Sequence, residues 1–264
     1  VPAFAPWGVL GLAFGALAAA LAAALPLRRP APAGGWRSLR AVPAAEWRAA
    51  AAEHADFPRL NAPHAFLGAL QDAAAIGLVL AATGDAAAGW WALALRYLKA
   101  PATLVGGSIA QALYPQLSQA SHDQGLQLLR RTVGLLILAA CALAGVLLWA
   151  APAGFRWAFG ADWSPAGDLA QALAVYVAAH FVASPLGVVT LAWRRQAWAL
   201  QVAVAGQVLF LSALAVGLWT GGLLAAAWAV SWIMGAFYAG YAAWLVSGRL
   251  RPGRAGGENP PVVP

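Results

Sequence analysis

Seven apolar runs, each long enough to cross a bilayer, constrain this chain more than any other feature of its sequence. About 20 consecutive apolar residues cross the hydrocarbon core of a membrane as a helix, and lipid-exposed backbone must satisfy its own hydrogen bonds. The sequence therefore predicts an all-α polytopic membrane protein with seven transmembrane helices. We place them at Trp7–Leu27, His64–Thr83, Ala88–Leu113, Thr132–Ala151, Ala166–Leu191, Ala197–Leu218 and Leu223–Val246.

The composition excludes an ordinary soluble domain. Charged residues make up 9% of the 264 residues and hydrophobic residues 62%, whereas soluble domains carry about 25% charged residues. The net charge of +7 does not indicate a nucleic-acid partner, because the basic residues lie in short loops between apolar runs. Cys141, the single cysteine, excludes a disulfide framework and a cysteine-based metal site. We expect no metal and no organic cofactor.

The loop arginines predict an orientation, since cytoplasmic loops carry an excess of Lys and Arg. If the loop after the first run is cytoplasmic, the outer loops hold Arg156, while Arg96 and Lys99 lie within a run. This places the N-terminus outside and the C-terminus in the cytoplasm. The remaining basic residues then all fall inside: Arg28, Arg29, Arg37, Arg40, Arg48, Arg59, Arg130, Arg131, Arg194, Arg195, Arg249, Arg251 and Arg254.

Two segments differ from the apolar runs. Within residues 28–63, the stretch from about Ala44 to His54 is rich in alanine with a few charged residues. We predict a helix there, lying either along the cytoplasmic membrane surface or in a solvated linker. Residues 247–264 are rich in Gly, Pro and Arg without periodicity, which predicts a disordered tail.

Two cations lie inside the third apolar run. Arg96 and Lys99 are three residues apart, so they share one face of a helix, and Thr103 continues that face. A charged side chain within a membrane costs several kcal/mol by most estimates, and such residues commonly line substrate or ion pathways. We predict a cationic stripe that faces a water-filled interior. The alternative is that both cations neutralise acidic neighbours in a packed bundle.

The same run contains residues that weaken a helix. Pro101 removes one helical hydrogen bond. Gly106 and Gly107 have no side chains, which makes the helix easier to bend there. We predict a hinge at these three positions.

Asp72 and His180 are polar residues in other runs. Asp72 lies about 12 Å from one membrane face and Lys99 about 16 Å from the other, at about 1.5 Å per residue. In a core about 30 Å thick the two are nearly level, which predicts an ion pair and leaves Arg96 uncompensated. His180 is either a proton-coupling residue or a hydrogen-bonded packing residue.

Glutamines within the runs have two interpretations. They bond a sugar's hydroxyl groups or bridge neighbouring helices, and bridging is the safer expectation for any one of them. The residues concerned are Gln71, Gln111, Gln171, Gln201 and Gln207. No GxSxG, HExxH or P-loop motif occurs, and the spacing of Asp162 and Asp168 does not indicate a glycosyltransferase. We do not expect an enzyme.

Several short motifs from Asp56 to Ser247 occur in a specific order. They are Asp56-Phe57-Pro58, Asn61-Ala62-Pro63, GWWALA at 89–94 leading to Arg96, Pro101, GGSIAQ at 106–111, Tyr114-Pro115 with Ser118, and Phe159-Gly160 with Trp163 and Gly167. Together they resemble the polysaccharide and O-antigen flippases of the multidrug/oligosaccharidyl-lipid/polysaccharide exporter superfamily.

The resemblance implies two six-helix lobes that move an undecaprenyl-pyrophosphate-linked oligosaccharide across the bacterial inner membrane by alternating access. Residues 1–27 would be the last helix of a truncated N-terminal lobe, 28–63 a cytoplasmic linker, 64–246 the complete C-terminal lobe, and 247–264 a cytoplasmic tail. The implied partners are the lipid-linked oligosaccharide, membrane lipids and the missing N-terminal lobe of the same protein. Arg96 and Lys99 would receive the pyrophosphate.

Other functions fit the sequence less well. An ion-coupled small-molecule extruder of the same superfamily predicts an acidic, aromatic-lined cavity. An O-antigen polymerase or ligase predicts a large outer loop with clustered polar residues, whereas the loops here are short. A seven-helix receptor or retinal protein is suggested only by the number of runs and by Lys99.

Overall fold

A computed structural model describes residues 18, 21–22, 43–53 and 62–253. The chain divides into two units, residues 1–55 and 56–264. In the first unit, α3 (Ala44–Glu53) is the helix expected at about Ala44–His54, and its place at a membrane surface stays a prediction. The run at Trp7–Leu27, except for residues 18 and 21–22, lies outside the described residues, as does the tail beyond 253.

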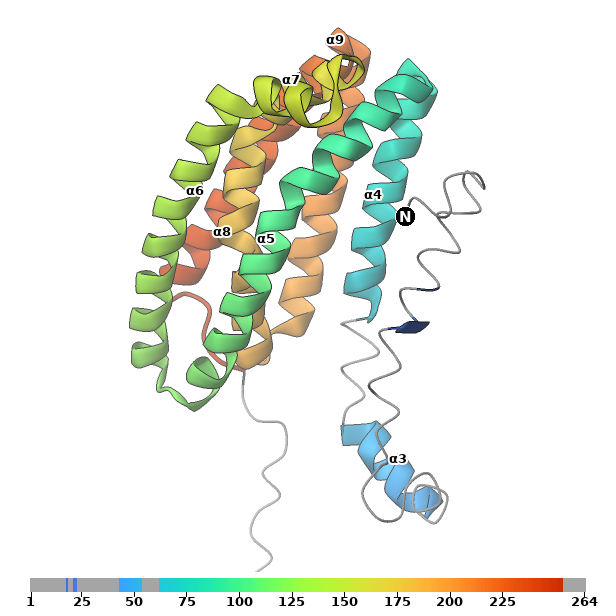
Figure 1. Cartoon of the computed structure of the whole chain (residues 1–264). Coiled ribbons are helices and arrows are strands. Elements are labelled where there is room, and N and C mark those ends of the chain that lie inside the picture. Colours follow the sequence, from blue (N-terminus) through green and yellow to red (C-terminus); the bar gives the residue numbers. More distant parts are fainter. Residues whose placement is uncertain (1–17, 19–20, 23–42, 54–61, 254–264) are drawn as a thin grey trace, which may run out of the picture. The chain divides into compact units, whose positions relative to one another are not determined.

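The second unit is all-helical over its described residues, 62–253. Its elements are α4 (Ala62–Thr83), α5 (Asp85–Gln119), α6 (His122–Phe159), the 3₁₀ turn η4 (Ala161–Trp163), α7 (Ser164–Ala172), α8 (Ala174–Ala192) and α9 (Gln196–Val246). Apart from α7, its α-helices run up and down the bundle (Figure 1).

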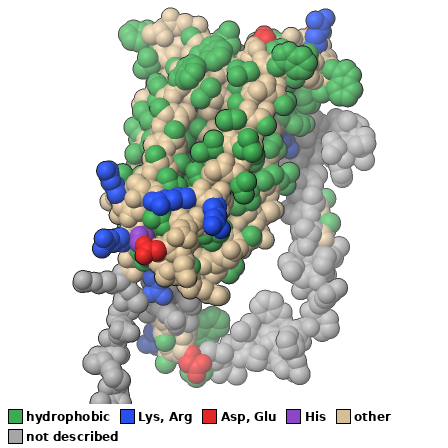
Figure 2. Space-filling model, turned by 90° about the vertical axis from the view of Figure 1, so that its left-hand side faces the viewer, with side chains coloured by type: hydrophobic (Ala, Val, Ile, Leu, Met, Phe, Trp, Pro, Cys, Tyr) green, Lys and Arg blue, Asp and Glu red, His purple; other side chains and the backbone are tan. Residues whose placement is uncertain are grey.

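Four of the described helices are long and apolar enough to cross a membrane: α4, α6, α8 and α9. The 35-residue α5 is long enough, but Asp85, Arg96 and Lys99 make it less apolar. Large apolar side chains also cover the outside of the bundle; Leu104 is 74% exposed and Leu135 71% exposed. Such a surface is rare on a soluble monomer, and Figure 2 shows it over most of one face.

Local sequence fixes where these helices begin and end. Gly84, with φ of 87°, separates α4 from α5 because glycine adopts positive φ without steric cost. Ser121 and Gln124 form a capping box at the start of α6, in which each side chain accepts the backbone N–H of the other residue.

α9 consists of two helical arms. At about 1.5 Å per residue, its 51 residues would extend more than twice the thickness of a bilayer core. The backbone leaves the helical conformation at Gly221 and Gly222, where Gly222 has φ of 75°, and the chain turns back. The break falls between the two apolar runs that end at Leu218 and begin at Leu223.

The run predicted as one helix at Ala166–Leu191 is two helices, which corrects that prediction. The chain turns at Leu173, so α7 lies across the end of the bundle and α8 runs along it (Figure 1). Beyond the turn, the backbone N–H of Tyr176 donates to the hydroxyl of the fully buried Ser231 at 3.2 Å. Residues 172–179 are all apolar, so the sequence showed no sign of this turn.

Two buried apolar clusters hold the bundle together. The first lies toward the α7 end and includes Trp91, Phe210, Leu214 and Met234. The second lies toward the opposite end, which we call the loop end, and includes Leu129, Leu186, Val189 and Leu245. Among the described residues, the buried members of the second cluster include none from α4 or from the first arm of α9. Those two segments therefore leave space between themselves and the rest of the bundle.

The segment Ser247–Gly253 is held across the loop end, although it was expected to belong to a disordered tail. The N–H of Gly253 donates to the carbonyl of Trp193 at 2.8 Å, and Leu250 is 7% exposed. Figure 2 shows basic side chains gathered toward one end of the bundle. The arginines nearest the loop end are Arg130, Arg131, Arg194, Arg195, Arg249 and Arg251.

The contact between the arms of α9 predicts the effect of one methyl group. A Cβ at Gly217 would lie 2.3 Å from the Cα of Ala226, which is backbone and has little room to move. We expect Gly217→Ala to destabilise the protein by about 1–3 kcal/mol through overpacking. Thermal unfolding in detergent measures the change.

Gly240→Ala is the matched control, because nothing lies within 4 Å of a Cβ at Gly240. Its gain in helix propensity is at most about 1 kcal/mol, so stability should be equal or higher. Equal stability of the two variants would contradict the close approach of the arms.

Candidate functional site

A cavity of about 660 Å³ lies among α4, α5, α8 and both arms of α9. Although the helices are apolar, many of its lining side chains are polar. They are Gln71, Asp72, Lys99, Tyr176, His180, Ser184, Thr190, Gln196, Gln207, Tyr238 and Tyr241. Many polar residues of the apolar runs thus share one internal surface.

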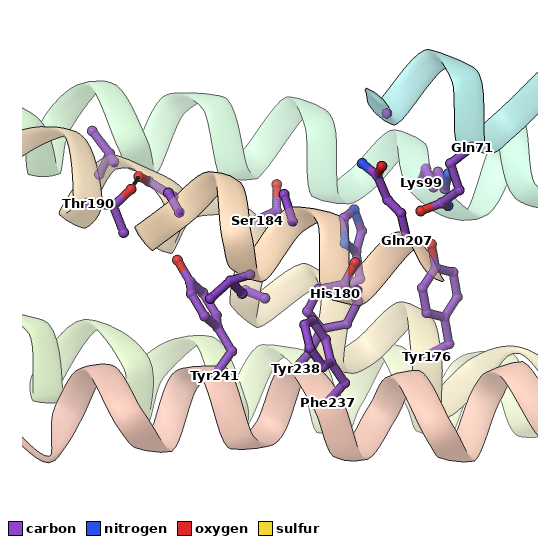
Figure 3. Close-up of a pocket in the computed structure, with 18 of the residues that line it drawn as sticks. Gln71, Lys99, Tyr176, His180, Ser184, Thr190, Gln207, Phe237, Tyr238 and Tyr241 are labelled. Atoms are coloured by element: carbon purple, nitrogen blue, oxygen red, sulfur yellow. Dashed lines mark hydrogen bonds between the residues drawn. The ribbon is translucent and has the colours of Figure 1, made fainter. Parts of the chain in front are cut away.

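The cavity runs lengthwise through half of the bundle. Its lining on α8 extends from Tyr176 to Leu191, about 22 Å along a helix axis. Figure 3 shows Thr190 at one end and Tyr176, near Lys99 and Gln71, at the other. We call the part lined by Tyr176, His180, Phe237 and Tyr238 the aromatic end. From there the cavity reaches the loop end, where α9 begins.

Asp72 and Lys99 form an ion pair on the cavity wall. Lys99 Nζ lies 2.7 Å from Asp72 Oδ1 and joins α5 to α4. The structure thus contains the pair that the depths of the two residues predicted. The Lys99 side chain is 23% exposed and the Asp72 side chain 51% exposed, so the pair is accessible from the cavity. Both residues also line a second, smaller cavity of about 340 Å³.

Arg96 lies on the other side of this pair. It lines the smaller cavity together with Asp72 and Ile76 and does not line the larger one. Among the described residues, no carboxylate forms a salt bridge with Arg96. Thr103 lines neither cavity, and its hydroxyl donates to the carbonyl of Lys99 at 3.0 Å. Of the predicted stripe, Arg96 and Lys99 therefore share the smaller cavity, Lys99 also lines the larger one, and Thr103 lines neither.

His180 lies in the larger cavity between two tyrosines. Its ring centroid is 5.8 Å from that of Tyr176, in a stacked arrangement, and 5.3 Å from that of Tyr238. Its Nδ1 atom is buried, with no hydrogen-bond partner among the described residues. The structure brings His180 into one cavity with Asp72 and Lys99, and its role in proton coupling stays a prediction.

The glutamines divide into two groups. Gln171 bridges helices, since its Nε2 donates to the carbonyl of Leu148 at 2.6 Å. Gln71 and Gln207 instead line the cavity, and neither makes a side-chain hydrogen bond to another described residue. Gln111 and Gln201 are exposed and do not line the cavity. Helix bridging therefore describes Gln171 but not the two glutamines of the cavity.

The predicted hinge residues have different surroundings. α5 is assigned as one continuous helix through Pro101. Gly106 is buried, and a Cβ there would lie 3.1 Å from the hydroxyl of Ser184 on α8. Gly107 has open space around it. Gly106 therefore has a packing role in this structure, and bending of α5 at these positions stays a prediction.

Sequence reasoning missed the aromatic lining. Tyr176 and His180 are four residues apart on α8, and Tyr238 and Tyr241 are three apart on α9. These spacings place each pair on one helical face, which was a usable signal. The spacing alone did not show that the two faces meet.

No protein-family model, characterised protein or solved structure matches this chain. The resemblance to the flippases therefore stays a prediction that rests on short motifs. Functional inference depends on the chemistry of the two cavities.

The ion pair predicts a measurable coupling. Asp72→Asn or Lys99→Gln alone leaves the other charge unpaired beside apolar helices, and we expect each to cost roughly 1–3 kcal/mol, between the values typical of exposed and buried pairs. The double exchange Asp72→Lys with Lys99→Asp should recover most of the loss, as measured by thermal unfolding in detergent.

Asp168→Asn serves as the control, because Asp168 is exposed on α7 and makes no side-chain hydrogen bond or salt bridge in the described structure. A double exchange no more stable than either single variant would show that the pair contributes nothing.

Proposed function

We propose that this protein is a membrane transporter that flips a lipid-linked oligosaccharide across the bacterial inner membrane. The observation that supports this proposal most strongly is a polar cavity inside a bundle whose outer surface is apolar. Polar and ionisable residues are costly within a membrane and commonly line transport pathways. On this proposal the apolar runs are seven transmembrane helices, and residues 64–246 form one six-helix lobe of a two-lobe transporter.

The charges of the site support an anionic lipid carrier. A pyrophosphate group is strongly disfavoured in a low-dielectric interior unless cations receive it. Arg96 lines the smaller cavity without a salt bridge among the described residues, and its guanidinium can bind phosphate in a bidentate manner. Lys99 lies beside it and is neutralised by Asp72. We propose that Arg96 binds the pyrophosphate first and that a phosphate oxygen then competes with Asp72 for Lys99.

The shape of the cavity supports alternating access. The larger cavity reaches the loop end, while the first apolar cluster, including Trp91, Phe210 and Met234, fills the opposite half of the bundle. Arginines concentrate near the loop end, which by the positive-inside rule is cytoplasmic. We propose that this conformation is open to the cytoplasm, where the cargo enters, and that the C-terminus is cytoplasmic.

A second candidate is an ion-coupled extruder of small organic cations. The aromatic lining favours it, because aromatic faces attract cations. Among the described lining residues, however, the acidic group is Asp72, which Lys99 already neutralises. The cavity wall therefore has no net negative charge from this pair, and we place the extruder second.

The proposal predicts a specific loss of transport. In vesicles containing the full-length protein, Arg96→Ala should slow the flipping of a fluorescent undecaprenyl-pyrophosphate oligosaccharide by about 10- to 100-fold. This corresponds to about 1.5–3 kcal/mol for hydrogen bonds to a charged group. Arg96→Lys should retain part of the rate, because it keeps the charge without the bidentate geometry.

Arg156→Ala is the matched control, since Arg156 is exposed in the last turn of α6 and lines neither cavity. It should flip the lipid at the original rate. If Arg96→Ala did the same with normal expression and folding, Arg96 would not be the phosphate ligand. Transport of organic cations by that variant would then favour the extruder.

A further inference from the structure

We propose that the aromatic end of the larger cavity is a binding subsite for one ring of a neutral sugar. The site extends the proposed function by assigning the glycan part of the cargo to residues within this single lobe. The identity of the natural ligand rests on the proposed function. Binding of a simple sugar does not, because it can be measured without transport.

The first argument is an aromatic platform held in place by its neighbours. The Tyr176 and Tyr238 ring centroids lie 6.2 Å apart, with His180 next to both. Phe237 meets Tyr238 edge-on at 5.5 Å, and a Cβ at Gly206 would lie 2.9 Å from the Phe237 ring. Tyr176 is 2% exposed and supports the other rings from behind, whereas the partly exposed rings of His180 and Tyr238 offer their faces to the cavity. Rings fixed in this way bind a ligand at little entropic cost. The C–H face of a pyranose is flat enough to pack on such faces.

The second argument is the set of uncharged polar groups around the platform. Gln71 on α4 and Gln207 on α9 lie at this end of the cavity (Figure 3). Each amide supplies two donors and an acceptor, and neither side chain is engaged with another described residue. His180 adds a buried Nδ1 atom without a partner among the described residues. Paired donors and acceptors beside an apolar face suit a ring with several hydroxyl groups.

The third argument is position. Asp72 and Lys99 line both cavities, with the sugar platform on one side and Arg96 on the other. A sugar on the platform would direct its anomeric oxygen toward the pair, and the attached phosphate would lie near Arg96. Further sugar units would extend past Ser184 toward the loop end. The volume of about 660 Å³ lies within the range of about 300–1,000 Å³ typical of ligand sites.

The test is saturation-transfer NMR on the full-length protein in nanodiscs, with methyl glycosides of glucose, galactose and N-acetylglucosamine as probes. At least one glycoside should receive saturation at its ring C–H protons. Tyr238→Leu and Gln207→Leu, on separate arms of α9, should each lower the signal fivefold or more. Tyr238→Phe should keep at least half of it, because the aromatic face remains.

Matched controls lie outside both cavities. Tyr114→Leu and Gln201→Leu replace exposed residues of the same types and should leave the signal unchanged. Thermal unfolding identifies any variant that fails to fold, and the two cavity variants are independent of one another in this respect.

Three results would overturn the subsite. The first is no glycoside signal, and the second is equal signals in the cavity variants and the wild type. The third is displacement of the bound glycoside by the organic cation tetraphenylphosphonium at a concentration lower than that of the glycoside. No glycoside signal from the wild-type protein, together with intact lipid flipping, would refute the subsite alone. A glycoside signal that depends on Tyr238 and Gln207, together with unchanged flipping by Arg96→Ala, would support the subsite and refute the phosphate assignment.

Discussion

A lysine in the middle of an apolar helix needs a counter-charge, and the rest of the site depends on how this chain supplies it. Lys99 of α5 pairs with Asp72 of α4 at 2.7 Å. Breaking such a pair leaves an uncompensated charge, which is more costly than either the pair or two apolar residues. The pair therefore ties α4 to α5 at mid-helix and forms the wall between two cavities, with Arg96 on one side and the aromatic end on the other.

Packing with small residues explains why the bundle is filled at one end and hollow at the other. Near the turn of α9, Gly217 and Ala226 let the two arms touch, and α7 covers the adjoining cluster. Small residues at helix contacts permit this close approach. Toward the loop end the buried cluster is built from α5, α6, α8 and the second arm of α9. α4 and the first arm of α9 stand away from it, and polar side chains line the space.

The sequence predicted much of this architecture because hydrophobic length and charge cost are strong signals. It indicated the helical class, the division of α9 near Gly221 and the pairing of Asp72 with Lys99. It did not reveal the turn at Leu173, where apolar residues continue without interruption. It also placed Arg96 and Lys99 on one stripe; residues three apart differ by about 60° around a helix, and of the two only Lys99 reaches the larger cavity. The aromatic end depends on the meeting of two helices distant in sequence, which no local pattern specifies.

The central claim is that the cavity holds water while the outer surface of the same helices faces lipid. Ala203 lines the cavity, and its neighbour Val204 lies on the outer surface with 41% exposure. The decisive measurement is the rate at which a membrane-impermeant maleimide, added on the side of the loop-end arginines, labels Ala203→Cys and Val204→Cys. Both variants would also carry Cys141→Ala, so that the introduced cysteine is the one that is labelled. Maleimide reacts with thiolates, and thiolates form in water. The account predicts labelling at least tenfold faster at position 203. Faster labelling at position 204 would contradict it.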